Sequence, residues 1–254
     1  MKIVLFFFVS LIFIQSCFAV DSPTSNAAPI SHDIFDRLLK KYVTDKGEVN
    51  YAGFKKEQKE FAKYQDLISK NAPASNWSKN EILAYWINAY NAFTIQLILD
   101  NADQKITSIK DIGSKIKIPF VNTPWDVKFI EIGGKKMDLN NIEHGIIRKQ
   151  FKEPRIHFAL VCAAKSCPPL RNEAFTAERL DAQLNSQAEK FINDDSKNNV
   201  SANSAEVSKI FDWYGMDFKP TPIIDILNKY SKTKISNKGK ITFKTYDWAL
   251  NGSL

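Results

Sequence analysis

The chain has 254 residues, of which 44% are hydrophobic and 25% are charged, and its formal net charge is +7. These values are ordinary for a soluble globular protein with one large domain or two small ones. The positive charge is spread over many lysines, with no long basic run and no aromatic-rich binding motif, so the sequence gives no reason to expect nucleic-acid binding.

The first 19 residues have the pattern of a signal peptide. Lys2 is followed by an apolar run of about 12 residues, which is too short to span a bilayer as a helix, and Cys17-Phe18-Ala19 fits a cleavage site. We therefore expect a periplasmic or secreted protein with no transmembrane segment after cleavage. The alternative is a lipoprotein signal with a lipid anchor at Cys17, although Gln15 fits that pattern poorly.

Residues 20–30 are rich in Ser, Ala, Pro and Asn, and we expect a flexible leader there, followed by a single domain over residues 31–254. Apolar residues at helical spacing predict a helix that Ser31 caps and a second helix over Phe54–Ser69.

The strongest helix signal begins at Ser78. Ser78 and Glu81 form a capping box, and the apolar residues that follow, to about Leu99, surround the helix on nearly every side. This pattern predicts a buried central helix. Asn88 and Asn91 share one face of it, so their amides are expected either to hold neighbouring loops or to line a polar binding pocket.

The second half mixes strands and helices without regular alternation. This order predicts an α+β domain, with the central helix packed on a small mixed or antiparallel sheet. The expected elements are a strand over Asp126–Ile132 ending at Gly133-Gly134, a helix from Asp138 to about Lys149, a strand over Arg155–Cys162, a helix over Thr176–Ile192, a hairpin over Val200–Phe211, a helix from Thr221-Pro222 and an extended segment over Lys240–Trp248.

Arg155–Arg171 carries the residues most suited to chemistry. His157 is a candidate base and Cys162 a candidate nucleophile, but a spacing of five on a straight strand would send them to opposite faces. Removal of Cys17 with the signal would leave Cys162 and Cys167 as an even pair in an oxidising compartment. A disulfide, an inert buried thiol and a catalytic or metal-binding thiol all stay open.

A second polar group lies on the preceding helix. Glu143, His144 and Arg148 are close enough in sequence to form an acid–base or anion-binding site, or a surface ion pair. The spacing of the two histidines and two cysteines in this region matches no standard zinc motif, so we predict no metal site. No cofactor is predicted either.

Four motifs together resemble the domain of unknown function 547 family: YWINAYNAFTIQLIL, IEHGIIR, RIHFALVCAAKSCPPLR and YDWALN. The likeness runs from about Ile34 to Asn251. It implies that the Asn88/Asn91 helix, Glu143-His144, His157 and Cys162 are signature positions. Bacterial members are often exported, as expected here, whereas plant relatives commonly lack the cysteine that corresponds to Cys167.

A looser analogy is with papain- and transglutaminase-like hydrolases, which place a catalytic cysteine at the start of a buried helix and a histidine on a following strand. The buried helix and His157 come in that order, but residues 78–83 contain no cysteine. The analogy therefore concerns layout alone.

Two main hypotheses follow. The first is a hydrolase or transferase acting on an amide, peptide or envelope substrate, with His157 as base, Glu143 in support, and Cys162 or a water as nucleophile. The second is a non-catalytic periplasmic or secreted protein that binds a small molecule or peptide in a polar pocket. A thiol-redox role fits worst, because Cys162 and Cys167 lack the C-x-x-C spacing. Whether the protein is an enzyme stays open.

Overall fold

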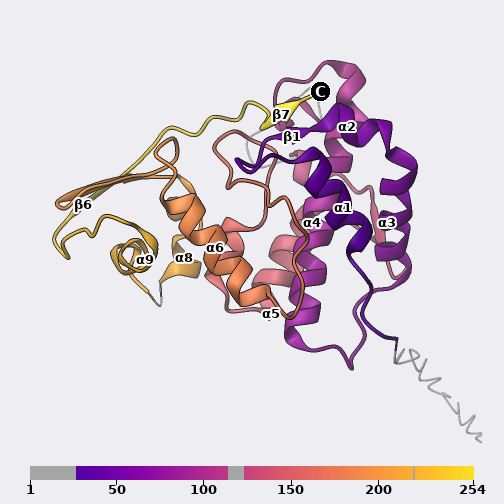
Figure 1. Cartoon of the computed structure of the whole chain (residues 1–254), viewed down its shortest axis with the longest axis horizontal. Helices are drawn as coiled ribbons and strands as arrows, with labels where there is room; N and C mark the ends of the chain where they lie inside the picture. The colour runs from indigo at the N-terminus through magenta and orange to yellow at the C-terminus, as the bar shows by residue number, and fades with distance from the viewer. Residues whose placement is uncertain (1–26, 114–122, 220) are drawn as a thin grey trace, which may run out of the picture.

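The computed structural model describes residues 27–113, 123–219 and 221–254 (Figure 1). The expected signal peptide, with Cys17, and most of the expected leader lie outside these residues. The last part of that leader lies against the folded domain, because Ala27 accepts a hydrogen bond from Trp77 and Ile30 packs on the core.

The described chain is an α+β structure, as the sequence predicts. The α-helices are α1 (Asp33–Tyr42), α2 (Tyr51–Lys56), α3 (Gln58–Lys70), α4 (Lys79–Asn101), α5 (Arg148–Gln150), α6 (Leu180–Ile192), α7 (Ile210–Trp213), α8 (Gly215–Phe218) and α9 (Ile223–Tyr230). Short 3₁₀ helices cover Ala102–Gln104, Ile109–Asp111, Pro124–Asp126 and Pro154–Phe158, and a π-helix covers Asn141–Ile147.

Within the described residues the strands form three small sheets. They are β1 (Val49–Asn50), β2 (Ile130–Ile132), β3 (Lys135–Met137), β4 (Asn199–Val200), β5 (Ser204–Val207), β6 (Lys240–Phe243) and β7 (Gly252–Ser253). β1 and β7 pair in parallel, β2 and β3 form an antiparallel hairpin, and β5 lies between antiparallel β4 and parallel β6. Gly133 and Gly134 both have positive φ, as the two-residue turn between β2 and β3 requires.

Helix α4 is the buried central helix that the sequence predicts. Its capping box is present, because Ser78 Oγ accepts from the Glu81 amide at 3.2 Å and Glu81 Oε2 accepts from the Ser78 amide at 2.6 Å. Its main neighbours are α2, α3 and the π-helix, so the small sheets lie further out. Among the described residues one helical stretch, Lys79–Gln104, is apolar and long enough to cross a membrane, and most of it is buried inside the protein.

Two hydrophobic clusters fill the interior of the part of the chain that the structure describes. The larger surrounds α1 to α4, and the smaller lies among α6, α7, α9 and β5. Figure 1 shows α1 to α4 on one side and α8 and α9 on the other, with α6 between them. Phe158 belongs to the smaller cluster and stacks on Phe191 at 5.2 Å between ring centroids, whereas Ala159, Leu160 and Val161 belong to the larger one. The segment around His157 therefore joins the two clusters.

This segment differs from the sequence prediction. Arg155–Cys162 is not a strand: Pro154–Phe158 forms a 3₁₀ helix, and the following residues are irregular. Pro154 has no amide hydrogen to give to a strand partner and suits the first turn of a helix, where Glu153 accepts from the Arg155 amide at 3.1 Å. The strand-parity argument that separates His157 from Cys162 therefore does not apply.

Buried side-chain amides take the place of a strand ladder. Asn91 donates to Ala159 O at 2.9 Å and accepts from Val161 N at 3.0 Å. Asn88 makes the same pair of bonds to the carbonyl and amide of Phe175, at 2.8 and 2.9 Å. From α6, Gln187 donates to Phe158 O and Pro169 O. Buried backbone groups need such partners, so α4 and α6 hold the irregular chain between them.

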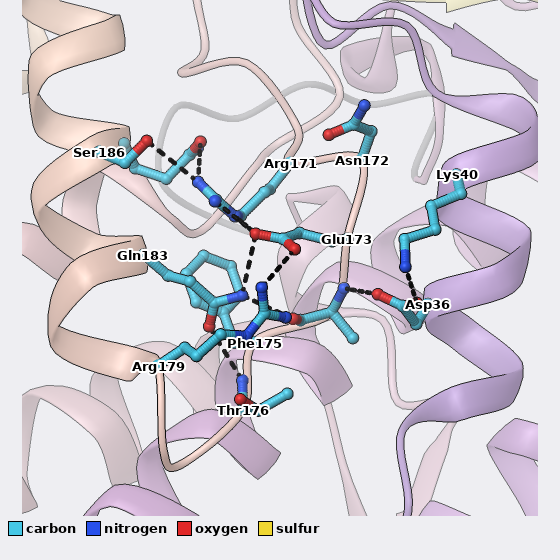
Figure 2. Close-up of polar contacts among 12 residues, drawn as sticks. Asp36, Lys40, Arg171, Asn172, Glu173, Phe175, Thr176, Arg179, Gln183 and Ser186 are labelled. Carbon is cyan, nitrogen blue, oxygen red and sulfur yellow. Dashed lines mark hydrogen bonds and ion pairs between the residues drawn. The ribbon is translucent and has the colours of Figure 1, made fainter.

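The end of the irregular chain is held from both sides as well (Figure 2). Asp36 of α1 accepts from the Ala174 amide at 3.0 Å, and Gln183 of α6 accepts from the Thr176 amide at 3.0 Å. Glu173 lies between Arg171 and Arg179. Burial opposes its charge, but hydrogen bonds from these arginines and from Gln183 outweigh that effect and lower the pKa of Glu173 to about 2.

Replacing Asn91 should destabilise the protein strongly. The change Asn91→Ala leaves a buried carbonyl and a buried amide without partners, and we expect the free energy of unfolding to fall by about 2–4 kcal/mol. Urea denaturation measures this. The control is Asn101→Ala on the same helix, where the amide donates to the helix carbonyl of Leu97 and accepts from the exposed side chain of Gln104, and it should cost under about 1 kcal/mol. Equal losses in the two variants would contradict the loop-holding role.

Candidate functional site

A cavity of about 310 Å³ lies beside the π-helix and the irregular chain. Five residues predicted from the sequence line it: Glu143, His144, His157, Cys162 and Cys167. Side chains from the π-helix, from the 3₁₀ helix and from the loop between Cys162 and Cys167, which we call the disulfide loop, thus converge on one space. Their convergence is a finding of the structure, and their chemical roles stay predictions.

His157 is held in the wall of this cavity by a carboxylate and an aromatic ring. Its Nε2 lies 2.7 Å from Oδ2 of Asp217, and its ring stacks on Tyr214 with centroids 3.8 Å apart. Phe218 packs on it at 5.6 Å. The imidazole is only 3% exposed, so its orientation is fixed by these neighbours.

Asp217 is an important residue that the sequence prediction missed. It lies on α8, 60 residues after His157. Arg148 donates to both carboxylate oxygens, through Nε at 2.6 Å and Nη2 at 2.8 Å. Hydrogen bonds from Arg148, and then from His157, lower the pKa of Asp217 to about 2 against the opposing effect of burial. The carboxylate is therefore ionised at neutral pH.

His157 is neutral at pH 7. Burial lowers its pKa below the usual 6.5, although the charge of Glu143 and the hydrogen bond to Asp217 oppose that shift. Because Asp217 is ionised and can only accept, the proton of the neutral ring is on Nε2. The lone pair is then on Nδ1.

The π-helix places its two polar residues differently. Glu143 is 5% exposed and faces the cavity, whereas His144 is largely exposed and its Nδ1 lies 2.9 Å from Nη1 of Arg148. A π-helix is rare and frequently occurs at functional sites. Burial, and then the charge of Glu143, raise the pKa of Tyr90 and of Tyr214, so both phenols stay protonated.

The two cysteines are disulfide-bonded. The Sγ atoms of Cys162 and Cys167 are 1.96 Å apart, and the hydroxyl of Tyr246 lies 3.3 and 3.2 Å from them. Of the alternatives that the sequence leaves open for Cys162 and Cys167, the structure contains the disulfide. A sulfur in a disulfide is not a thiolate, so Cys162 is no nucleophile in this state.

Neither Asn88 nor Asn91 is among the described residues that line the cavity. Both are buried, and their amides are used by the backbone bonds already described. They therefore have the loop-holding role, one of the two expected for them, and a part in ligand binding stays a prediction. Arg148 likewise contacts Asp217 and His144 rather than the cavity.

Aromatic rings form much of the remaining wall. Trp125, Trp213, Tyr246 and Trp248 line the cavity and contact one another, with Tyr246 and Trp248 centroids 4.6 Å apart. The YDWALN motif identifies two of these rings in the sequence. Trp213 and Asp217 lie in a short stretch, residues 210–218, that combines several aromatic residues with two acids, and this composition is the one signal that could have identified them.

No group of three or more His, Cys, Asp or Glu residues that could hold a metal ion is found within residues 27–113, 123–219 and 221–254. The histidines instead contact Asp217, Arg148 and aromatic rings.

The family resemblance is confirmed over part of the chain. Residues 74–192 match the family model described as "Protein of unknown function, DUF547". This range contains α4, the π-helix, His157 and both cysteines, but not Asp217. No curated protein and no solved structure matches the chain significantly, so the likeness to papain- and transglutaminase-like enzymes stays an analogy.

Thiol counting tests the disulfide. The purified mature protein, denatured without reductant, should show no free thiol from Cys162 and Cys167, and two after reduction. Because the bond closes a short loop, the double change of both cysteines to Ser should lower the free energy of unfolding by about 2 kcal/mol. Two free thiols in freshly purified protein from an oxidising compartment would contradict the pairing.

The neutral state of His157 predicts a pH dependence. Its folded pKa lies below 6.5, so the unfolded chain binds the proton first as pH falls, and folding stability decreases between 6.5 and the folded pKa. The stability advantage of the wild type over His157→Gln should therefore shrink below pH 6.5. NMR titration of the ring should give a midpoint below 6.5, and a midpoint above that value would contradict the assignment.

Proposed function

We propose that this chain, whose residues 74–192 match the DUF547 family model, is a hydrolase or transferase acting on an amide, peptide or envelope substrate. The family description assigns no function. The observation that carries the proposal is the hydrogen bond between His157 and Asp217 in the wall of a cavity that also contains Glu143.

A histidine oriented by a carboxylate is a recurrent general base. Asp217 holds the Nε2 proton, which leaves Nδ1 of His157 to accept a proton from a water or from the hydroxyl or amine of an acceptor. The oxygen or nitrogen then bonds to the substrate carbonyl carbon, and His157 returns the proton to the leaving amine. Hydrolysis and transfer differ only in the nucleophile.

The surrounding charges suit this cycle. When His157 takes the proton it becomes an imidazolium, and the negative charges of Glu143 and Asp217 both favour that state. Arg148 keeps Asp217 ionised and fixed in place. Glu143 is therefore assigned an electrostatic role beside the base, and Arg148 is a positioning residue.

The nucleophile in this proposal is a water or an acceptor substrate, since Cys162 is bonded to Cys167. The same disulfide supports our proposal that the protein is exported, because such bonds persist mainly in oxidising compartments. A periplasmic or secreted location is the proposed one, with a lipid anchor at Cys17 as the alternative.

The second candidate is a non-catalytic binding protein. It is supported by the aromatic wall of the cavity, which suits ligand contact as well as it suits substrate contact. The two candidates differ in whether bound material is turned over.

Turnover is measured on p-nitrophenyl esters, p-nitroanilides, peptides and cell-envelope fragments, with product detection by mass spectrometry. For any substrate that the wild type cleaves, His157→Ala should lower the rate by at least about 10²-fold, because general base catalysis contributes that much or more. Asp217→Asn should also reduce it.

The matched control is His32→Ala. His32 is a partly buried histidine whose Nδ1 contacts the Tyr64 hydroxyl at 2.7 Å, away from the cavity. It should keep the wild-type rate within about twofold, since it does not touch the base. A folded His157→Ala variant with an unchanged rate, or a wild type that turns over no member of the panel, would count against catalysis.

A further inference from the structure

The aromatic side chains that line the cavity form one contiguous cluster, which we call the aromatic box. The ring planes of Trp125 and Trp248 are inclined by 65°, those of Trp213 and Tyr246 by 52° and those of Tyr246 and Trp248 by 50°, whereas Trp213 and Trp248 stack at 25°. Tyr90 and Tyr214 also line the cavity. The faces of aromatic rings are electron-rich and attract positive charge.

The charged groups of the lining are acidic. Among the described residues that line the cavity, Glu143 and Asp126 are carboxylates, and none is Lys or Arg. This contrasts with the chain as a whole, which has a net charge of +7. Glu143 is 5% exposed, and Nδ1 of His144 lies 3.8 Å from its Oε1.

We propose that this cavity binds an organic cation, namely the alkylammonium group of a small molecule or of a substrate side chain. Aromatic faces attract such cations, and quaternary ammonium groups are recognised by aromatic cages in this way. The buried carboxylate of Glu143, which lines the same cavity, supplies the opposite charge. The volume of about 310 Å³ is at the lower end of ligand pockets and fits a small organic cation.

Two of these rings already contact cations of the chain itself. Lys110 Nζ lies 4.9 Å from the centroid of Trp248, and the guanidinium carbon of Arg148 lies 5.2 Å from that of Tyr214. Rings of this cluster therefore do interact with positive charge in this protein.

This inference rests on the proposed function in one respect, because it names the ligand class of the same cavity. Under that proposal the ammonium group anchors the substrate in the box and leaves its carbonyl near His157. Binding of the cation requires no turnover, so the two proposals can fail separately.

The test is isothermal titration calorimetry on the disulfide-bonded protein with choline, with its neutral carbon isostere 3,3-dimethylbutan-1-ol, and with N-acetylglucosamine. Choline should bind saturably and at least about tenfold more tightly than the isostere, because the shapes match and only the charge differs. Glu143→Gln should weaken choline binding by about tenfold or more and leave the isostere unaffected.

Trp213→Ala removes one wall of the box, and it should weaken choline at least about fivefold. Trp213 is 48% exposed, so its removal leaves the core intact. The matched control is Met216→Ala: Met216 is 66% exposed on the adjoining α8, does not line the cavity, and should change nothing.

Asp217→Asn separates the two proposals. Asp217 does not line the cavity, so this variant should bind choline like the wild type even though its turnover falls. Absent choline binding, equal binding of choline and the isostere, or saturable binding of N-acetylglucosamine alone would each overturn the cation site. A wild type that binds choline but turns nothing over would overturn the catalytic proposal and leave the cation site standing.

Discussion

The structure depends on side-chain amides that supply hydrogen bonds to the backbone, as a neighbouring strand does in a β-sheet. The chain from Phe158 to Thr176 is largely irregular yet buried, and its backbone groups need partners away from water. Asn88 and Asn91 on α4 and Gln187 on α6 supply them, each bonding to backbone atoms of this chain. A buried helix that carries amides at three-residue spacing can therefore fix the parts of an irregular chain that have no backbone partner, while residues 163–166 of the same chain bond to the backbone of residues 247–251.

That arrangement decides where the polar site residues lie. The irregular chain delivers His157 and the disulfide loop, the π-helix delivers Glu143, and α8 delivers Asp217. Electrostatics then separates the groups by charge state: Arg148 keeps Asp217 ionised, and burial keeps His157 neutral. An ionised acceptor beside a neutral imidazole fixes the ring proton on one nitrogen. The aromatic box and its carboxylate add a place for positive charge beside this pair.

The sequence predicts much of this framework, because local rules act strongly there. The capping box and all-round apolar pattern identify α4, and Gly133-Gly134 identifies a turn that needs positive φ. The family motifs single out Glu143, His144, His157 and Cys162, which do share one cavity. The predicted strand over Arg155–Cys162 is wrong. Residues with high β propensity also suit buried segments that pair with no strand, and here side-chain amides from distant helices make the hydrogen bonds to the backbone. Asp217 was missed because its link to His157 spans 60 residues and is set by tertiary packing.

Amide hydrogen exchange tests the central claim most directly. The amides of Val161 and Phe175 are outside every helix and strand, but Asn91 and Asn88 accept from them. If these side chains replace a ladder, both amides should exchange only through large-scale unfolding, with opening free energies close to those of the α4 amides. Exchange of Val161 and Phe175 at the rate of exposed loop residues would show that the irregular chain is not held in this way and would contradict the account.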